Sequence, residues 1–501
     1  MMMKKLLFTF LLCLFFFHLT AQEWSISYTG GYPSGRTHFN DGFVDGEGVT
    51  FLAGQEGPSL ETHDAAILRI QPDGTTQAFH YARTGCHSKL TCIIETSNDQ
   101  LFAAGNLFYD TDDSLLVLVL SKDLELLEEH HYGKETDAIS FGECNTITDN
   151  HGHVILSTYV SQDNAYKGTD YHGVFFKFNP QGEMIHRRYL IETYPDPVYF
   201  LMNFKLRQMW YRDDTLLCLA PAYGGVMSFV TFDADFNYLD EHPIWQDTDE
   251  KLDHSLFQDC YTDYWYNENE ALFFSSRGDA DHNKLRVSRV NTQGEFLEYL
   301  HLNERPDTID DAARPRCMAA ANDSTFFFSF HYHTWSHYPG IACVYRLNDR
   351  LEITGRHFDD DHDHYRTCLI LATPDGGCIT VNDSCHFNAI STSGHPIIKK
   401  LTPNDFEQIP WSTSPFEYVQ PRGKPYPNPC NDMLHIPLPN VEHKRIRCQI
   451  NDHLGRIVMD RIVPTDADML HLDLSRLQKG IYHYRIYSDR HTLQSETFIK
   501  M

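Results

Sequence analysis

The stretch Phe175-Phe176-Lys177-Phe178-Asn179-Pro180-Gln181-Gly182 joins a short apolar segment to a polar turn. The same pattern occurs in Ile67-Leu68-Arg69-Ile70-Gln71-Pro72-Asp73-Gly74 and in Val287-Ser288-Arg289-Val290-Asn291-Thr292-Gln293-Gly294. Weaker copies complete a set whose last apolar residues are Ile70, Leu120, Phe178, Phe232, Val290, Leu347 and Leu401, spaced 50 to 58 residues apart. A repeat of this length is typical of propeller blades and related arrays.

Each unit has a second landmark, a polar turn that leads into an apolar strand. Examples are Asp45-Gly46-Glu47-Gly48 before Val49 and Pro374-Asp375-Gly376-Gly377 before Cys378. Tight turns of Asn, Asp and Gly between short strands are hairpin signals. The unit therefore contains four antiparallel strands, and radial repetition of such a unit gives a β-propeller.

The two ends of the repeat region complement each other. The segment from Glu23 to Tyr28 resembles a fourth strand, but no first three strands precede it. The last unit has its first three strands, around Cys368, Ile379 and Ile398, and then enters a Pro-containing segment. Joining the N-terminal strand to these three closes the ring and removes exposed sheet edges. The predicted fold class is all-β, a seven-bladed β-propeller body followed by a small Ig-like β-sandwich.

Composition narrows the range of functions. The chain has 501 residues, 42% of them hydrophobic, and a formal net charge of −28. This charge argues against nucleic acid as a partner, because phosphate binding needs clustered Lys and Arg. Divalent metal ions and cationic ligands fit the charge better, although an acidic surface that only aids solubility is the simpler explanation.

The N-terminus predicts export. Met1 to Lys5 is short and positive, Leu6 to Leu19 is largely apolar, and Ala21 offers a small residue for cleavage. The apolar run is shorter than the ~20 residues of a membrane-spanning helix, so we expect a signal peptide at residues 1–21 and no transmembrane segment. A lipid-modified cysteine would be the first residue of the mature chain. Cys13 lies inside the apolar run, so we do not expect it to carry a lipid.

The C-terminal segment changes character after a linker at residues 408–424. Its landmarks, in order, are Tyr426-Pro427-Asn428-Pro429, Leu434-His435-Ile436-Pro437-Leu438, Ile450-Asn451-Asp452-His453-Leu454-Gly455-Arg456-Ile457-Val458, Gly480-Ile481-Tyr482-His483-Tyr484 and Phe498-Ile499-Lys500-Met501. Short alternating strands separated by turn residues predict a small β-sandwich.

The order, spacing and terminal position of these motifs resemble the type A sorting domain of the type IX secretion system. The resemblance covers residues 425–501. It implies passage through the periplasm to the cell surface or the medium, and the type IX secretion machinery as partner. The matching motif positions are Pro427, Asn428, Pro429, Asp452, Gly455, Arg456, Gly480 and Tyr482, for which turn geometry and core packing are equally good explanations.

The repeat region weakly resembles the propeller-like regions common in exported Bacteroidetes proteins. The resulting domain prediction is a signal peptide (1–21), a propeller body (22–407), the linker (408–424) and the sorting domain (425–501). A propeller fold implies no particular function, because propellers include enzymes, adhesins, receptors and scaffolds.

Histidine and aspartate gather in two predicted loops of neighbouring blades, which we expect to lie on the same face of the ring. Imidazoles and carboxylates together suit zinc, and carboxylates alone suit calcium. This patch is the candidate binding or metal site, although a solvated loop is the more common reason for such a sequence. Its members are His331, His333, His337, Asp359, Asp361, His362 and His364.

Five cysteines fall at similar places in the inner strands, namely Cys92, Cys144, Cys260, Cys317 and Cys368. Equivalent points on neighbouring blades should be more than ~7 Å apart, which is too far for a disulfide. We therefore interpret these cysteines as small buried core residues. Other pairs that remain open are Cys378 with Cys385 and Cys430 with Cys448.

No catalytic residues are assigned, because the sequence contains no phosphate-binding glycine loop, His-Glu-x-x-His or Gly-x-Ser-x-Gly motif. The leading hypothesis is a non-catalytic binding or adhesion protein that holds a glycan, a protein or a metal ion on the loop face of the propeller. The alternatives are a secreted polysaccharide-active glycosidase or lyase and a scaffold without a ligand.

Overall fold

The computed structural model describes most of residues 23–501. The described ranges are 23–30, 36–58, 62–109, 113–133, 140–142, 144–164, 168–190, 208–212, 214–221, 227–244, 261–267, 270–279, 282–302, 310–312, 316–322, 324–332, 341–359, 365–384, 395–408, 425–438, 446–452, 456–463, 469–488 and 491–501. The predicted signal peptide lies outside them. The chain divides into two compact units, residues 1–408 and 409–501. In the described ranges no helix is long and apolar enough to cross a membrane.

The first unit contains seven antiparallel sheets in its described residues, numbered here in chain order. Sheet 1 contains β2 (Arg36–Val44), β3 (Thr50–Gly57), β4 (Asp64–Ile70) and β5 (Thr76–Tyr81). Sheet 2 contains β6 (His87–Glu95), β7 (Gln100–Phe108), β8 (Asp113–Ser121) and β9 (Leu126–Gly133). Sheet 3 contains β10 (Ser140–Phe141), β11 (Asn145–Thr148), β12 (Val154–Asn164), β13 (Gly168–Phe178) and β14 (Met184–Tyr189).

Sheets 4 to 7 continue the series. Sheet 4 contains β15 (Gln208–Arg212), β16 (Thr215–Pro221), β17 (Met227–Phe232) and β18 (Tyr238–Pro243). Sheet 5 contains β19 (Tyr261–Asn267), β20 (Glu270–Asp279), β21 (His282–Asn291) and β22 (Phe296–His301). Sheet 6 contains β23 (Asp310–Ala312), β24 (Met318–Asn322), β25 (Thr325–Tyr332), β26 (Ile341–Asn348), β27 (Ile353–Asp359) and β31 (Glu407–Gln408). Sheet 7 contains β28 (Tyr365–Ala372), β29 (Cys378–Ser384), β30 (Pro396–Leu401) and β1 (Trp24–Ser27).

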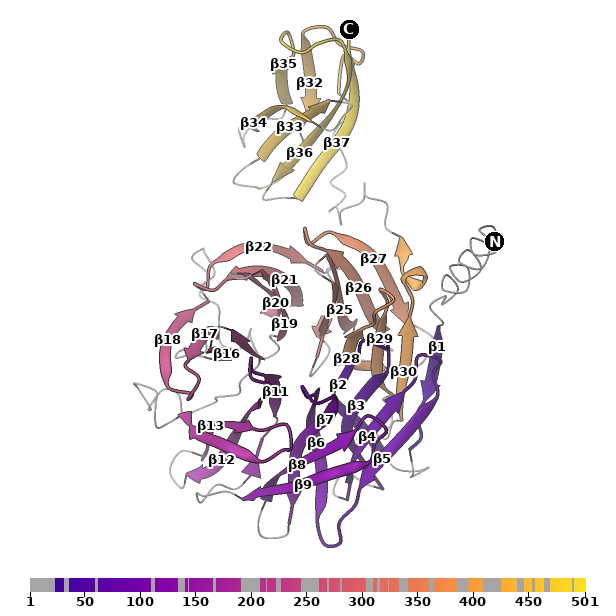
Figure 1. Ribbon diagram of the computed structural model, residues 1–501. Coiled ribbons are helices and arrows are strands. Elements are labelled where there is room, and N and C mark those ends of the chain that lie inside the picture. The colour runs from indigo at the N-terminus through magenta and orange to yellow at the C-terminus, as the bar shows by residue number, and fades with distance from the viewer. Residues whose placement is uncertain are drawn as a thin grey trace, which may run out of the picture. The chain divides into compact units, whose positions relative to one another are not determined.

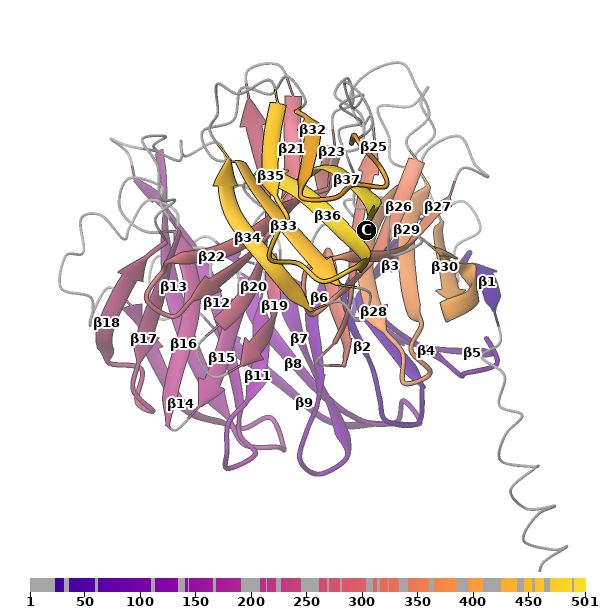
Figure 2. The ribbon, with the colours of Figure 1, turned by 90° about the horizontal axis from the view of Figure 1, so that it is seen from above.

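The sheets form a closed ring (Figure 1). Their inner strands contact one another in the order β2, β6, β11, β15, β19, β24 and β28, and β28 returns to β2. Strands such as β5, β9, β18 and β22 lie on the outside. Figure 2 shows the same body from the side, with the strands of each sheet spanning the thickness of the ring. The all-β propeller fold predicted from the sequence is therefore confirmed.

The N-terminal strand completes sheet 7, as the two ends of the repeat region predicted. β1 pairs antiparallel with β30, with Trp24 opposite Lys400 and Ser27 opposite Ile397. Since β30 is the third strand of its sheet, a segment from the start of the chain supplies the fourth. The first and last segments of the body are thereby hydrogen-bonded to each other.

The middle strands are buried on both faces, because each sheet packs between two others. Along β7, Leu101 and Ala103 pack in one cluster with residues of sheet 1. The alternate residues Phe102 and Ala104 pack in another cluster with residues of sheet 3. Side chains alternate between the faces of a strand, so a strand covered on both faces needs a continuous apolar run. This explains why the repeat appears in the sequence as uninterrupted apolar segments.

The recurring turn has a specific hydrogen-bonded form. In three of its copies an Asn side-chain oxygen accepts hydrogen bonds from backbone N–H groups two and four residues later, at 2.9 to 3.1 Å. The same amide donates to a Glu carboxylate at 2.7 to 2.8 Å. The pairs are Asn179 with Glu183, Asn291 with Glu295 and Asn348 with Glu352. Such side-chain bonds to the local backbone stabilise tight turns, which explains the conspicuous polar tetrad after each third strand.

The outer strands of sheets 2 to 5 each begin with a β-bulge. The strand register skips one residue there, namely Leu127, Ile185, Leu239 and Leu297. All four side chains are exposed. An outer strand presents unpaired backbone groups to other chains, and a bulge twists that edge so that it pairs poorly. The bulges are therefore a device against edge-to-edge association.

The second unit contains two further sheets, built from the predicted strands of the tail. One pairs β32 (Met433–Pro437) with β35 (Met469–Asp473). The other has the order β34 (Ile457–Val463), β33 (Ile446–Asp452), β36 (Gly480–Ser488) and β37 (His491–Lys500). One core cluster joins both sheets, with Leu434, Leu472, Tyr484 and Phe498 among its buried members.

Candidate functional site

Two residues of the predicted His and Asp patch occupy one row across sheet 6. His331 of β25 pairs with Ala342 of β26, and Ala342 pairs with Asp359 of β27. Asp311 of β23 pairs with His331 from the other side. Since neighbouring strands lie about 4.8 Å apart, the backbones of His331 and Asp359 are about 10 Å apart. β25 ends at Tyr332 and β27 ends at Asp359, so both loops of the patch leave from the same end of the sheet.

Asp359 is a buried carboxylate in which one oxygen forms an ion pair. Its Oδ2 lies 2.6 Å from Nζ of Lys399 in sheet 7, and the side chain is 5% exposed. Its Oδ1 is also buried and has no hydrogen-bond partner in the described residues. The remaining members of the patch, together with the side chain of His331, lie outside the described residues: His333, His337, Asp361, His362 and His364. In the described part of the chain, no group of three His, Cys, Asp or Glu residues is arranged to hold a metal ion.

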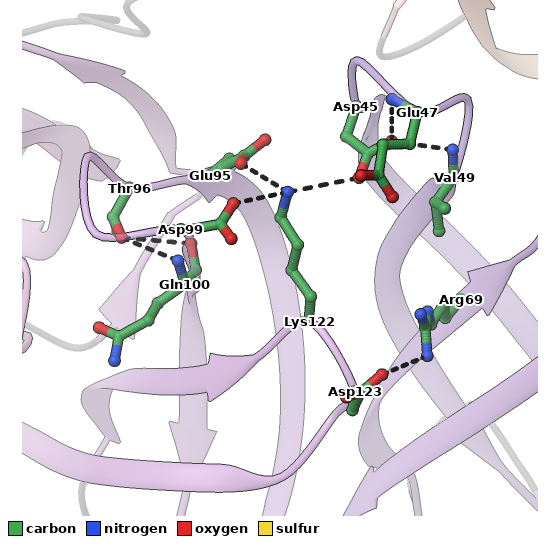
Figure 3. Close-up of polar contacts among 10 residues, drawn as sticks. All are labelled: Asp45, Glu47, Val49, Arg69, Glu95, Thr96, Asp99, Gln100, Lys122 and Asp123. Atoms are coloured by element: carbon green, nitrogen blue, oxygen red, sulfur yellow. Dashed lines mark hydrogen bonds and ion pairs between the residues drawn. The ribbon is translucent and has the colours of Figure 1, made fainter.

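Lys122 pairs with three carboxylates where sheets 1 and 2 meet (Figure 3). Its Nζ lies 2.7 Å from Glu95 Oε1, 2.8 Å from Asp99 Oδ1 and 3.4 Å from Asp45 Oδ2. The hydrogen bond from Lys122 lowers the pKa of Asp99. Asp45 comes from the turn after β2, whereas Lys122 follows β8. Because the lysine contacts all three acids, we assign this cluster to the junction between the sheets.

Asp149 is held in a second such cluster at the turn before β12. Its Oδ1 accepts hydrogen bonds from the backbone N–H groups of His151 and His153 at 2.8 and 2.9 Å. Its Oδ2 lies 2.9 Å from Lys177 Nζ and 3.0 Å from His153 Nδ1. Burial opposes ionisation, but these bonds outweigh it and lower the pKa of Asp149 to about 2. Asp149 is therefore an ionised structural acid.

A polar bridge at the inner strands joins Arg316, which lies just before β24 and bridges to Leu369 of β28, to sheets 1 and 2. Arg316 donates from Nη1 to the carbonyl oxygen of Gly42 at 2.7 Å, and its Nη2 lies 3.5 Å from Asp41 Oδ1. The backbone N–H of Ile93 donates to Asp41 Oδ2 at 2.9 Å. Burial raises the pKa of Asp41 despite the nearby arginine. Sequence reasoning missed this bridge because Arg316 and Gly42 are 274 residues apart.

The inner strands also carry bulges that connect neighbouring sheets. In β2 the register shifts at Asn40, whose Nδ2 donates to the carbonyl oxygen of Leu90 in β6 at 2.7 Å. In β6 it shifts at Thr91, whose Oγ1 accepts from the backbone N–H of Cys144 at 3.1 Å. Each bulged residue thus bonds to the next sheet of the ring. A bulge signal is absent from the sequence because it depends on strand pairing.

Four of the five inner-strand cysteines are described, and all four are buried as predicted: Cys92, Cys144, Cys317 and Cys368. Cys260 lies outside the described residues. The side chains of Cys92 and Cys144 nevertheless interact with each other inside one buried cluster. The bulge at Thr91 brings the two strands together at this point.

In the tail, the residues matched to the sorting motif have clear structural roles. Asn428 lies between Pro427 and Pro429, both of which follow cis peptide bonds. Its side chain bonds β37 twice, donating to the Thr497 carbonyl and accepting from the Ile499 N–H, each at 3.0 Å. The proline segment is therefore fastened to the last strand of the chain.

The remaining motif residues stabilise turns and packing. Asp452 accepts from the Arg456 backbone at 3.0 Å and from its guanidinium at 2.7 and 2.8 Å. Gly480 begins β36 opposite Lys500. Tyr482 is buried, stacks on Phe498 and donates from its hydroxyl to the Gln478 carbonyl at 2.8 Å. Gly455 lies outside the described residues.

Comparison with known proteins identifies the tail. Residues 424–500 match the family described as the secretion system C-terminal sorting domain. A search of curated proteins gives no match. Similar solved structures include a protein of unknown function from Dyadobacter fermentans DSM 18053, at 10% identity and a TM-score of 0.41, covering 64% of this chain and 96% of that one. Drosophila semaphorin 2a follows at 6% identity and a TM-score of 0.46, covering 96% and 97%. An ulvan lyase of polysaccharide lyase family 25 has 10% identity and a TM-score of 0.40, covering 76% and 96%.

Proposed function

We propose, from the premise that residues 424–500 are a secretion system C-terminal sorting domain, that the propeller body is a non-catalytic binding or adhesion module. The sorting domain marks the protein for export to the cell surface or the medium by the type IX machinery. The ligand of the body is a glycan, a protein or a metal ion held at the loop end of sheets 6 and 7.

The observation that carries this proposal is the row through His331 and Asp359. This row supports a shared binding surface, because the loop after β25 and the loop after β27 are rich in His and Asp and leave from the same end of the sheet. We call this surface the rim. Asp359 contributes a buried oxygen that has no partner in the described residues. A buried carboxylate oxygen without a donor is costly, so a ligand or cation near it would be stabilising.

Zinc is the ion that this proposal favours, because His331, His333, His337, His362 and His364 add imidazoles to the carboxylates of Asp359 and Asp361. Coordination requires neutral imidazole. Zinc affinity should therefore fall as pH drops through the His range near ~6.5. Calcium bound by carboxylates alone would respond less in that range.

Calorimetric titration of the purified exported protein with zinc and with calcium tests the site. A variant with His331→Ala, His333→Ala and His362→Ala should lose at least about ten-fold in zinc affinity. The matched control carries His435→Ala and His471→Ala, which remove a pair of imidazoles in the tail whose Nδ1 atoms are 2.6 Å apart, and should bind as the parent does. Absence of zinc and calcium binding in the parent, or equal affinity in the parent and the rim variant, would refute the metal site.

A glycan array and a panel of polysaccharide hydrolase and lyase assays on the same protein test the broader proposal. Binding without turnover is the expected result. Turnover of any polysaccharide would replace the binding module with the alternative, a polysaccharide-active enzyme that uses the same loop face.

A further inference from the structure

Two buried thiols meet between sheets 2 and 3. Cys92 lies in β6, and Cys144 immediately precedes β11. Their side chains interact with each other and are 1% and 4% exposed. Each thiol also donates to a backbone carbonyl, Cys92 to Ala104 at 3.6 Å and Cys144 to Gly142 at 3.9 Å. Both belong to the cluster that packs sheet 2 against sheet 3, together with Phe102 and Phe141. The contact therefore joins two inner strands whose cysteines are 52 positions apart in the sequence, from 92 to 144.

The backbone holds this approach in place independently of the sulfur atoms. The residue before Cys92 is Thr91, whose Oγ1 accepts from the Cys144 N–H at 3.1 Å. The register shift between Leu90 and Cys92 creates the bulge that puts Thr91 in this position. Nearby, Asn106 of β7 donates to the carbonyl oxygen of Phe141 at 2.5 Å. Two hydrogen bonds between the sheets therefore flank the two thiols.

The compartment of the protein determines what such a pair does. An exported chain passes through the periplasm, where dithiols within reach of each other are oxidised. We propose that Cys92 and Cys144 form a disulfide in the exported protein and thereby link sheets 2 and 3 at the inner wall of the ring. The bond closes a loop that includes the middle and outer strands of sheet 2.

The chemistry is thiol–disulfide exchange with a disulfide donor of the periplasmic oxidoreductase class. One cysteine thiolate attacks a donor sulfur, forms a mixed disulfide and releases one donor thiol. The second cysteine then attacks the mixed disulfide and releases the second donor thiol, so two protein thiols and one donor disulfide become one protein disulfide and two donor thiols. Because both sulfur atoms are buried in the folded ring, the exchange takes place before sheets 2 and 3 close.

The two thiols are not equivalent. Burial and the hydrogen bond to Cys144 raise the pKa of Cys92. The hydrogen bonds from Cys92 and from Thr91 lower the pKa of Cys144. In the folded ring Cys144 is therefore the more easily ionised of the two thiols.

Peptide mapping of the protein collected from the surface or the medium is the direct test. The protein is denatured in iodoacetamide without reductant, digested and analysed by mass spectrometry. We expect one linked peptide pair containing Cys92 and Cys144, which separates after reduction. Recovery of both cysteines as alkylated thiols would overturn the proposal, and this readout needs no variant to fold.

Thermal unfolding with and without reductant gives a second test. The wild-type protein should lose several degrees of melting temperature in reductant. The variants Cys92→Ser and Cys144→Ser should each start lower and show no further loss. The control Cys218→Ser removes a fully buried thiol of sheet 4 whose pKa is raised by burial alone, and it should remain sensitive to reductant. A wild-type melting temperature that reductant leaves unchanged would count against the bond.

Discussion

At the scale of single residues, two acids of the ring, Asp149 and Asp41, differ because of what surrounds them. Asp149 meets a lysine, a histidine and two backbone amides, and its pKa is lowered to about 2. Asp41 has two backbone amides, those of Ile93 and Gly42, and an arginine at 3.5 Å, but burial outweighs them and raises its pKa. The balance between burial and the stabilising donors decides whether a carboxylate in the ring ionises easily.

The substitution Asp149→Asn tests the first of these environments. An unfolded Asp titrates near ~3.9, so the lowered folded pKa stabilises the protein fully above about pH 4, and this stabilisation is lost as pH falls toward about 2. The variant should be less stable than wild type at pH 7 and should lose less stability between pH 4 and pH 2. Urea unfolding across this pH range measures both effects.

The control Asp123→Asn removes an exposed carboxylate that is paired with Arg69 at 2.8 Å. Exposed ion pairs contribute about 0 to 1 kcal/mol, so this control should follow the wild-type curve. Parallel pH profiles of wild type and Asp149→Asn would show that the turn cluster does not stabilise the ionised acid.

At the scale of elements, the body ends in a short latch formed by η4 (Pro403–Asp405) and β31. β31 pairs with β27 at the outside of sheet 6, although the preceding strand β30 belongs to sheet 7. Between η4 and β31, Phe406 is buried against Phe327, with ring centroids 5.4 Å apart. The guanidinium of Arg346 lies over the Phe406 ring at 5.2 Å. The latch therefore fixes the last residues of the body across two sheets.

The substitution Phe406→Ala should destabilise the body by about 3 to 5 kcal/mol, because it removes a buried aromatic ring and leaves a cavity. Denaturant unfolding of the exported protein measures the change. The matched control Phe358→Ala removes a phenylalanine of β27 that is 38% exposed, and it should cost much less. Equal stability of the two variants would mean that the latch does not contribute to the fold.

At the scale of the whole molecule, the body and the tail are two compact units with separate cores. Body strands pair only with body strands in the described residues, and the same holds for the tail. Each unit therefore satisfies its own backbone hydrogen bonds and can fold without the other. The sorting function is confined to the second unit.

Deletion of residues 425–501 should leave a folded propeller in the periplasm. The truncated protein should keep the unfolding midpoint of the body, because the ring and its latch end at Gln408. Cell fractionation with immunoblotting and circular dichroism of the periplasmic product measure location and folding. Truncated protein at the surface or in the medium in normal amounts would contradict the role of the tail. The control carries a substitution in the body, Asp123→Asn, and should be exported normally.

Much of the fold was predictable because its signals are local. The tetrad Asn179-Pro180-Gln181-Gly182 forms its turn through hydrogen bonds between residues at most four positions apart, so the turn can be recognised from this short stretch alone. The pairing of β1 with β30 was predictable for another reason. The chain begins with a single fourth strand and its last repeat unit lacks a fourth strand, so the two complete one sheet. The candidate rim was predictable only as a set of residue types, and the row through His331 and Asp359 required the strand register.

The sequence alone determined the repeat, the four-stranded unit and the sorting tail, because turn chemistry and strand alternation depend on neighbouring residues. Only the tertiary structure decided which distant groups meet. Arg316 reaches Gly42, Lys122 reaches Asp45 and Cys92 meets Cys144. These contacts depend on where bulges shift a strand and how the ring closes. Both follow from packing among sheets rather than from any local stretch of the chain.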